Sequence, residues 1–262
     1  AAHTQSAFAI GDEKTEVCSR IQQPVYVVLS NTAEVDAAIQ SALEKYWTLS
    51  EYVFISKEEY KEVKATKDVL YMMIVQNEGV DGSTFTYENV LQTFYLVRNG
   101  TYRINVSGVP VRTDATNESI EIANAIRILQ DKIAFRIAKE QQQVEYAAYN
   151  EAANARVSIV KAKTLYITTD DLDKTLAGLT DIQAVYSGEV VLVSKSELDH
   201  IIEKNNPNTA YVVIENYKSG INYINSKKVI DAESGMVLYI NEGKSIKPAA
   251  FSKNDFIALQ NN

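Results

Sequence analysis

The 262-residue chain has a single cysteine, Cys18, and only two histidines, His3 and His200. One cysteine cannot form an intramolecular disulfide, and neither histidine has other metal-ligand side chains around it at suitable spacing, so we expect no metal site. The same shortage argues against a Ser-His-Asp or Cys-His nucleophile, because its base must lie within hydrogen-bond reach. Stability should therefore come from a buried core, which a chain of this length can form without metals or disulfides.

Glycine is also scarce, and the charge has the wrong sign for nucleic acid. The ten glycines form neither a G-x-G-x-x-G nor a G-x-x-x-x-G-K-[ST] phosphate loop, and there is no G-x-S-x-G nucleophile turn. We therefore expect no cofactor and no catalytic residue. The net charge of −8 argues against nucleic-acid binding, which needs a basic face to replace phosphate counterions. The longest apolar run, residues 69–75, is far shorter than the roughly 20 residues of a transmembrane helix.

The first residues, AAHTQSAFAIG, are small, mostly uncharged and poor in signals for secondary structure. They are typical of the mature end left after cleavage of a secretory signal at a small-residue site. An arbitrarily chosen first residue would look the same. We expect an exported protein, which also suits its 16 tyrosines.

Three pairs of segments repeat in the same order along the chain. FISKEEYK at 54–61 matches LVSKSELD at 192–199, VYVVLSNTAEVDAAI from Val25 matches LYITTDDLDKTL from Leu165, and LYMMIVQNEG from Leu70 matches AYVVIENYKSG from Ala210. The second and third pairs share one offset, and the first pair differs from it slightly, as small insertions would produce. The pattern predicts an internal duplication.

Each copy predicts the unit β-α-β-α-β-β-β, so the expected fold class is α/β with a mixed sheet, duplicated, with a long helix joining the two units. The third strand of each unit is apolar almost throughout, which indicates burial on both faces, and each unit ends in a hairpin. The expected elements are strands at 25–29 and 165–168, helices at 33–46 and 171–179, strands at 52–55 and 190–193, strands at 69–75 and 210–214, and hairpin turns at Asn99-Gly100 and 232–235.

The repeated phrase contains a helix start. Ser56 precedes Glu59 by three residues, and Ser194 precedes Glu197 by three, which is the spacing of an S-x-x-E capping box. In such a box the serine oxygen accepts from a backbone N–H of the first turn, and the glutamate accepts from the N–H of the serine. We therefore interpret these four residues as structural caps rather than as a Ser-Lys catalytic dyad.

Between the copies, residues 117–154 contain neither glycine nor proline and predict one long helix or two joined ones. A stripe of apolar residues runs along its first half and then fades. We expect a helix packed on the first sheet that continues as a partly solvated connector; a coiled-coil dimer seam is the alternative. A strand is expected near 157–160. The predicted organisation is an N-terminal extension (1–22), a first α/β repeat with the long helix (23–155) and a second α/β repeat (156–262).

Two loops and one pair of tyrosines are the candidate binding residues. Asn31 and Thr32 follow the first strand of one copy, and Asp170 and Asp171 follow the first strand of the other, at the carboxyl ends where open α/β sheets bind ligands. The spacing Asp170-Asp171-x-Asp173 does not fit a calcium loop, and the favoured explanation of the cluster is Asp170 as the N-cap of the helix expected at 171–179, with the other two acids in its first turn.

The tyrosine pair is Tyr146 and Tyr149, three residues apart on the polar half of the long helix. Exposed there, the two rings could stack against sugar rings or a partner protein. Most of the other tyrosines lie in predicted strands, where tyrosine is a common residue.

The order of elements resembles that of two α/β domains of bacterial envelope proteins. One is in the curli-secretion lipoprotein, and the other is the amino-terminal domain of the Tol periplasmic protein. The phrases FISKEEYK, LVSKSELD and VIDAESGMVLYI are similar to those of uncharacterised exported proteins of Bacteroides-type bacteria. This resemblance implies a bacterial protein that is periplasmic, associated with the outer membrane or secreted. It carries no catalytic motif and transfers no site residue.

These observations predict a non-catalytic envelope or secreted protein that acts by protein–protein interaction, self-association or assembly. The alternative is a module that binds a small ligand or glycan at the carboxyl ends of its parallel strands. An enzyme would require a deep pocket with several convergent acids, which the sequence alone does not identify.

Overall fold

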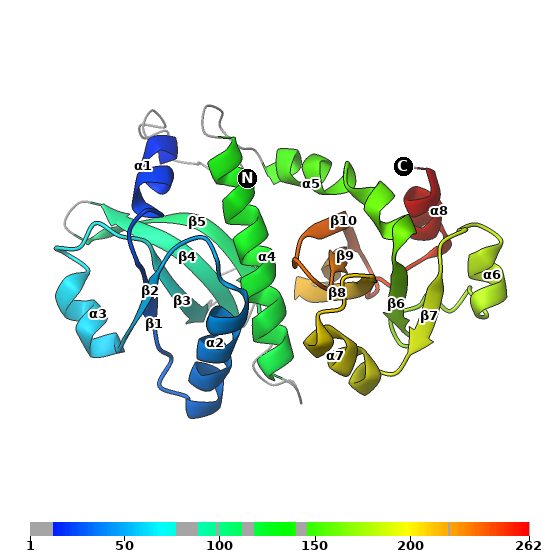
Figure 1. Ribbon diagram of the computed structural model, residues 1–262, viewed down its shortest axis with the longest axis horizontal. Coiled ribbons are helices and arrows are strands. Elements are labelled where there is room, and N and C mark those ends of the chain that lie inside the picture. The colour runs from blue at the N-terminus through cyan, green and yellow to red at the C-terminus, as the bar shows by residue number, and fades with distance from the viewer. Residues whose placement is uncertain are drawn as a thin grey trace.

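The computed structural model describes residues 13–76, 89–97, 100–111, 118–139, 146–219 and 221–261. Within them lie two five-stranded mixed sheets flanked by helices, which confirms the α/β class (Figure 1). The helix α4 stands between the two sheets, and each sheet has further helices on its outer side.

The first sheet has the strand order β2-β1-β3-β4-β5. Its apolar contacts form on both faces: α2 and α4 cover one face, and α3 packs on the other, where the rings of Tyr60 and Tyr71 lie 5.2 Å apart. The elements are α1 (Glu13–Arg20), β1 (Val25–Val28), α2 (Ala33–Tyr46), β2 (Tyr52–Ile55), α3 (Lys57–Val63), β3 (Tyr71–Gln76), β4 (Asn89–Val97), β5 (Tyr102–Pro110) and α4 (Glu118–Ala138).

The second sheet has the same arrangement, β7-β6-β8-β9-β10. The helices α6 and α8 and the short 3-10 helix η1 cover one face, and α7 and α4 cover the other. The elements are α5 (Tyr146–Asn154), η1 (Val157–Ala162), β6 (Thr164–Thr168), α6 (Leu179–Gln183), β7 (Val190–Val193), α7 (Lys195–Lys204), β8 (Thr209–Ser219), β9 (Asn222–Asp231), β10 (Val237–Ser245) and α8 (Lys253–Asn261).

The strand register agrees with the sequence alignment of the two copies. Tyr26 of β1 pairs with Tyr71 of β3 in parallel, and Tyr166 of β6 pairs with Tyr211 of β8 in the same way. The sequence repeat aligns Tyr26 with Tyr166 and Tyr71 with Tyr211, so the two copies form equivalent strand pairs. Because a shift by one residue would turn every side chain to the other face, the shared register gives the two sheets equivalent faces.

The helix predicted at 171–179 is wrong. The backbone turns after β6, the Asp173 carboxylate accepts from Thr175 N at 2.9 Å as in an Asx-turn, and Leu172 forms a bridge with Phe251. Only the five-residue α6 follows, so Asp170 is not a helix N-cap. The strand predicted near 157–160 is also wrong, because these residues form η1, with Val157 and Val160 buried against the second sheet.

The long helix is two helices, α4 and α5, with residues 140–145 outside the described part of the chain. Its stripe is not available for a dimer seam, because Ile122, Ile126, Leu129 and Ile133 are fully buried inside this chain. Residues on the remaining sides of α4 are buried too, as expected for a helix enclosed by protein. The apolar core of the first repeat therefore continues through α4 into the second repeat.

Two helices near the chain ends had no counterpart in the sequence prediction. Val17 and Ile21, in and just after α1, are buried in the first core, so part of the N-terminal extension belongs to the packed structure. Phe256 and Leu259 of α8 are fully buried in the second core. Both helices cover a sheet face that would otherwise meet water.

Candidate functional site

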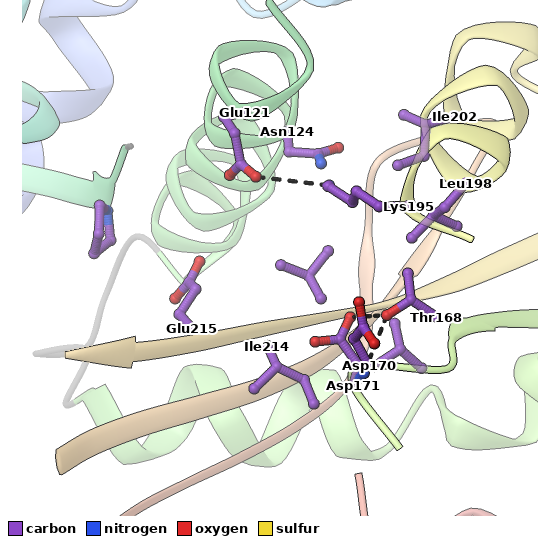
Figure 2. A pocket seen from close by; sticks show the side chains of 13 residues that line it. Glu121, Asn124, Thr168, Asp170, Asp171, Lys195, Leu198, Ile202, Ile214 and Glu215 are labelled. Atoms are coloured by element: carbon purple, nitrogen blue, oxygen red, sulfur yellow. Dashed lines mark hydrogen bonds and ion pairs between the residues drawn. The ribbon is translucent and has the colours of Figure 1, made fainter. Parts of the chain in front are cut away.

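A cavity of about 260 Å³ lies where the second sheet meets α4 (Figure 2). Three elements of the second repeat and two of the first form its described walls, so both repeats contribute. The residues are Thr168, Asp170 and Asp171 at the end of β6, Lys195, Leu198 and Ile202 of α7, Val212, Val213, Ile214 and Glu215 of β8, Glu121 and Asn124 of α4, and Pro110 of β5.

The carboxyl end of β6 brings two acids to this cavity. β6 ends at Thr168 while its neighbour β8 runs on to Ser219, so the turn after β6 lies over the continuing sheet. The hydroxyl of Thr168 donates to Asp171 Oδ2 at 2.7 Å and accepts from Asp171 N at 3.1 Å, which fixes Asp171. Asp170 is exposed, and its side chain lies beside that of Asp171 in Figure 2.

The helix α7 supplies one basic and two apolar groups. Its capping box is present, as predicted: Glu197 N donates to the Ser194 hydroxyl, and Ser194 N donates to Glu197 Oε2 at 2.8 Å. The box starts the helix at Lys195, so that Leu198 and Ile202, three and seven residues later, lie on the same side. Both are buried and form an apolar wall of the cavity.

Lys195 bridges the two repeats. Its ammonium lies 3.7 Å from Glu121 Oε1 of α4 and 3.1 Å from Asp199 Oδ1 of its own helix, and the lysine side chain remains 55% exposed. The distance to Glu121 is long for a charge-assisted hydrogen bond, which is normally about 2.7–2.9 Å. The contact across the cavity is therefore a loose one.

The α4 wall is held in place by a buried polar network. Tyr211 donates to Asn124 Oδ1 at 2.6 Å, and Arg127, one turn further along α4, donates to the carbonyl oxygens of Asp231 and Ala232. Burial raises the pKa of Tyr211 to about 12, although Arg127 opposes the shift, so the hydroxyl stays protonated and donates at neutral pH. The network fixes α4 against the second sheet.

Charge in the cavity is unevenly distributed. Glu215 is paired with Lys228, which is 3% exposed on the neighbouring strand. Of the other carboxylates in the described lining, Glu121 lies 3.7 Å from Lys195, and Asp171 is hydrogen-bonded to Thr168. The described lining thus combines four carboxylates and one ammonium group with an apolar wall. Across the described ranges, no cluster of three or more histidine, cysteine or acidic side chains could hold a metal ion.

Only one of the two loops predicted to bind a ligand is among the described residues that line the cavity. Asp170 and Asp171 line the cavity, but Asn31 and Thr32 lie in the first repeat, between β1 and α2, and are not among its described lining residues. There the Asp36 carboxylate accepts from Ser30 N at 2.6 Å and from Asn31 N at 3.1 Å. Asp36 of α2 thus already occupies the backbone N–H groups of this loop that could otherwise bind a ligand.

The predicted tyrosine pair does not form a stacking surface. Tyr149 is 4% exposed, donates to Asp131 Oδ2 at 2.8 Å and packs on Phe135, so its assignment to an exposed face is wrong. The reason is that α5 folds back onto α4 and β10 instead of continuing into solvent. The side chain of Tyr146 lies outside what the structure describes. The remaining predicted caps, Ser56 and Glu59, form a capping box at the start of α3.

Sequence reasoning missed four polar residues of the cavity: Glu121, Asn124, Lys195 and Glu215. One signal was available, since Asn124, Arg127 and Asp131 interrupt the apolar positions of α4 at intervals of three and four. A solvent-exposed helix face shows the same polar stripe, so this signal does not identify the packing partner. The charge of Glu215 also ends the continuous apolar run of β8.

The comparisons with known proteins add no identity to this geometry. No family model, curated protein or solved structure significantly matches the chain. Over the residues that the structure describes, no helix combines the length and the apolar character needed to cross a membrane.

Proposed function

We propose that the protein is a non-catalytic binding protein that takes a small ligand in the cavity between its repeats. The observation that carries the proposal is the position of the cavity at the carboxyl end of β6, where open α/β sheets bind ligands. An apolar wall with a few polar groups is the usual composition of ligand sites. The volume of about 260 Å³ lies just below the range of drug-sized ligands, roughly 300–1,000 Å³, and suits a small molecule.

Within this class, a small ligand other than a sugar is favoured. Sugar rings are commonly bound by stacking on an aromatic face, and the described lining contains no aromatic residue. The tyrosines proposed for stacking do not supply one, because Tyr149 is buried elsewhere. The polar groups of the described lining are carboxylates, the Asn124 amide, the Thr168 hydroxyl and the Lys195 ammonium, which can both accept and donate hydrogen bonds.

A thermal-shift screen with a library of small metabolites tests the proposal. A ligand at 100 times its dissociation constant should stabilise the folded protein by about 2.7 kcal/mol. Val213→Phe, which places a ring in the cavity, should abolish the shift for every ligand found. Met73→Phe changes the equivalent position of the first repeat and should leave binding intact. Ligands that bind Val213→Phe as well as the original protein would place binding elsewhere and contradict the proposal.

Self-association is a second candidate, supported by the first sheet. In the second repeat, α7 and α4 cover one face of the sheet. The equivalent face of the first sheet is covered by α3, whereas α4 packs on the opposite face of that sheet. Val53 is 43% exposed on β2, and Tyr26 and Met73 are half-buried on the same face. Sedimentation velocity tests this candidate: a concentration-dependent dimer that Val53→Asp dissociates would support it, and a monomer at all concentrations would argue against it.

We also propose, from the resemblance of the sequence phrases to exported bacterial proteins, that the protein acts in the cell envelope or outside the cell. Fractionation of the native host with an antibody against this chain tests the location. Recovery in the cytoplasmic fraction alone would contradict it.

A further inference from the structure

We propose that the second sheet carries a docking tip for an anionic lipid surface, formed by Ile221, Lys244, Ile246 and Lys247. The two isoleucines enter the lipid layer, and the two lysines contact its negatively charged head groups. The tip lies at the end of the sheet where β8 is connected to β9, and the proposal does not depend on the cavity.

The position of the tip follows from the lengths and register of the strands. β8, β9 and β10 have 11, 10 and 9 residues, whereas β6 and β7 have five and four. Tyr223, near the start of β9, pairs with Ser245, at the end of β10. Ile221, which precedes β9, and Ile246, which follows β10, therefore lie at the same end of these long strands.

Both isoleucines are unusually exposed for apolar side chains. Ile221 is 85% exposed and Ile246 is 76% exposed, and the next large apolar side chain in the described part of the chain, Tyr102, is 49% exposed. Single exposed apolar residues are common on protein surfaces. Two that meet at one end of a sheet form a local apolar surface, which indicates an interaction site.

The exposure of Ile246 is maintained by hydrogen bonds on both sides of it. The hydroxyl of Ser245 donates to Lys247 O across the isoleucine. Two residues further on, Ala249 is held by Asn216 of β8, whose Nδ2 donates to Ala249 O at 3.0 Å and whose Oδ1 accepts from Ala249 N at 2.7 Å. The backbone around Ile246 is thus anchored with its side chain in solvent.

The charge around the tip is opposite to that of the whole chain. The net charge of the protein is −8, but the two stretches that meet here, 216–230 and 243–254, contain no acidic residue. Lys244 and Lys247 are exposed on either side of Ile246. Because lysines near an anionic lipid surface are attracted to it, these two side chains direct the tip rather than the acidic remainder of the protein toward the lipid.

The small size of the tip favours lipid over a protein partner. A specific protein interface buries about 800 Å² on each partner and needs roughly 20–30 residues a side. A hairpin turn with two isoleucines offers much less, but lipid chains can surround single apolar side chains without a partner of matching shape. Lysine side chains suit this arrangement, since their apolar stems follow the isoleucines while the ammonium groups stay at the head groups.

Co-sedimentation with lipid vesicles tests the proposal. The full chain is mixed with vesicles of phosphatidylcholine alone or with vesicles that also contain about 30% phosphatidylglycerol, an anionic lipid. We expect about 10-fold tighter binding to the anionic vesicles, and added salt should weaken that binding because it screens the lysines.

Two apolar variants locate the inserted side chains. Ile221→Ser and Ile246→Ser should each weaken binding to the anionic vesicles about 10-fold, because each removes one apolar side chain from the lipid. Leu179→Ser is the matched control, since Leu179 is 40% exposed at the start of α6 and should not contribute. All three variants should keep the melting temperature of the original protein, because the changed side chains are exposed.

Two charge variants and one fluorescent variant complete the test. Lys244→Gln and Lys247→Gln should each weaken binding about 5-fold, whereas Lys174→Gln, an exposed lysine after β6, should have no effect. Ile246→Trp should retain binding, and its emission should shift to shorter wavelength when anionic vesicles are added. The native Trp47 is 6% exposed in the first repeat and should not change.

Three outcomes would overturn the proposal. Equal binding to both kinds of vesicle would exclude a role for the lysines, and anionic binding that no tip variant weakens would place the contact elsewhere. If no vesicle binds and Ile221→Ser instead dissociates a dimer in sedimentation velocity, the tip is a protein contact. Ligand binding in the cavity is measured separately by thermal shift, so none of these outcomes decides the proposed function.

Discussion

The two repeats share strand order and register but differ at the carboxyl end of their first strand. In the first repeat the 14-residue α2 follows β1, and its Asp36 closes the loop by accepting from Ser30 and Asn31. In the second repeat a turn replaces the helix and leaves Asp170 and Asp171 beside a cavity. The same sheet thus supports a closed loop in one copy and a ligand-sized space in the other, and the connection rather than the strands decides which.

The copies also differ in what covers equivalent sheet faces. The face that carries Tyr211 is covered by α7 and by α4 of the first repeat, whereas the face that carries Tyr71 has only α3 from the described elements. The second sheet consequently contains buried charges such as Lys228, and the first has mostly apolar residues in the corresponding cluster. The face in contact with the other repeat thus contains buried charge, whereas the equivalent face of the first sheet is a mostly apolar layer.

The largest expected effect is at Arg127, which joins the repeats. Arg127→Met removes a side chain that is 1% exposed and leaves the carbonyl oxygens of Asp231 and Ala232 without this donor. We expect a loss of about 3–4 kcal/mol in the free energy of unfolding, measured by urea denaturation. Arg136→Met is the control, because Arg136 donates to Val106 within the first repeat and should cost only about 1 kcal/mol. Equal losses would show that the junction is no stronger than the interior of one repeat.

A matched pair of tyrosines sharpens the comparison of the two faces. Tyr211→Phe should cost about 2 kcal/mol, because it removes the 2.6 Å donor to the buried Asn124. Tyr71→Phe, at the equivalent position, should cost at most about 0.5 kcal/mol, since the Tyr71 hydroxyl lies 3.4 Å from Lys67 O, a long distance for an O–H···O hydrogen bond. Chemical denaturation of both variants measures the difference, and a larger loss for Tyr71→Phe would reverse our account of which face carries the polar network.

The buried charges of the covered face predict a pH dependence. Burial, followed by repulsion from Lys228, lowers the pKa of Lys132 on α4 to about 8, although Glu215, Glu242 and Asp131 oppose the shift. In the unfolded chain a lysine has a pKa near 10.4, so the unfolded state binds more protons between about pH 8 and 10 and stability rises with pH there.

We expect a gain of about 1–2 kcal/mol between pH 7.5 and 9.5, after allowance for partial exposure of the side chain. Urea denaturation at several pH values measures it, and Lys132→Met should flatten the profile. If the free energy of unfolding of the original protein falls over this range, the pKa of Lys132 is not lowered in the folded state.

The smallest expected effects are equal in the two repeats. Ser56→Ala and Ser194→Ala should each cost about 1 kcal/mol, because each serine caps its helix in the same way. Hydrogen bonds from the serines lower the pKa of Glu59 and of Glu197, so both contributions should be present at neutral pH and decline as the carboxylates are protonated in acid. Thermal melts at pH 7 and pH 3 test this, and a change in ligand binding by Ser194→Ala without loss of stability would contradict a purely structural role.

Local patterns predicted the parts of the fold that depend on neighbours in the sequence. The apolar spacing of α2 and the capping boxes at Ser56 and Ser194 determine helices within a few residues, and all three form as expected. The segment 171–179 was predicted as a helix because its leucines have helical spacing. In the structure Asp173 and Thr175 form a turn, and Gly178 adopts a φ of 152°. Here a local turn and the contact with Phe251 outweighed helix periodicity.

The candidate site was only half predictable for a related reason. Asp170 and Asp171 follow a strand, so their place at its carboxyl end could be deduced from the sequence. Glu121 and Lys195 meet because α4 packs on the second sheet, and this packing depends on the buried contacts of Asn124 and Arg127 with residues more than 80 positions away. A single sequence contains no direct signal for such pairings.

The side chain of Asn154 has a consequence for solubility. It donates to Ile240 O at 3.1 Å and accepts from Ile240 N at 2.8 Å, which are the two bonds that another strand would make with β10. An open strand edge invites pairing with a foreign chain and leads to aggregation. The Asn154 amide thus blocks the pairing of a further strand with Ile240 at this edge of the sheet.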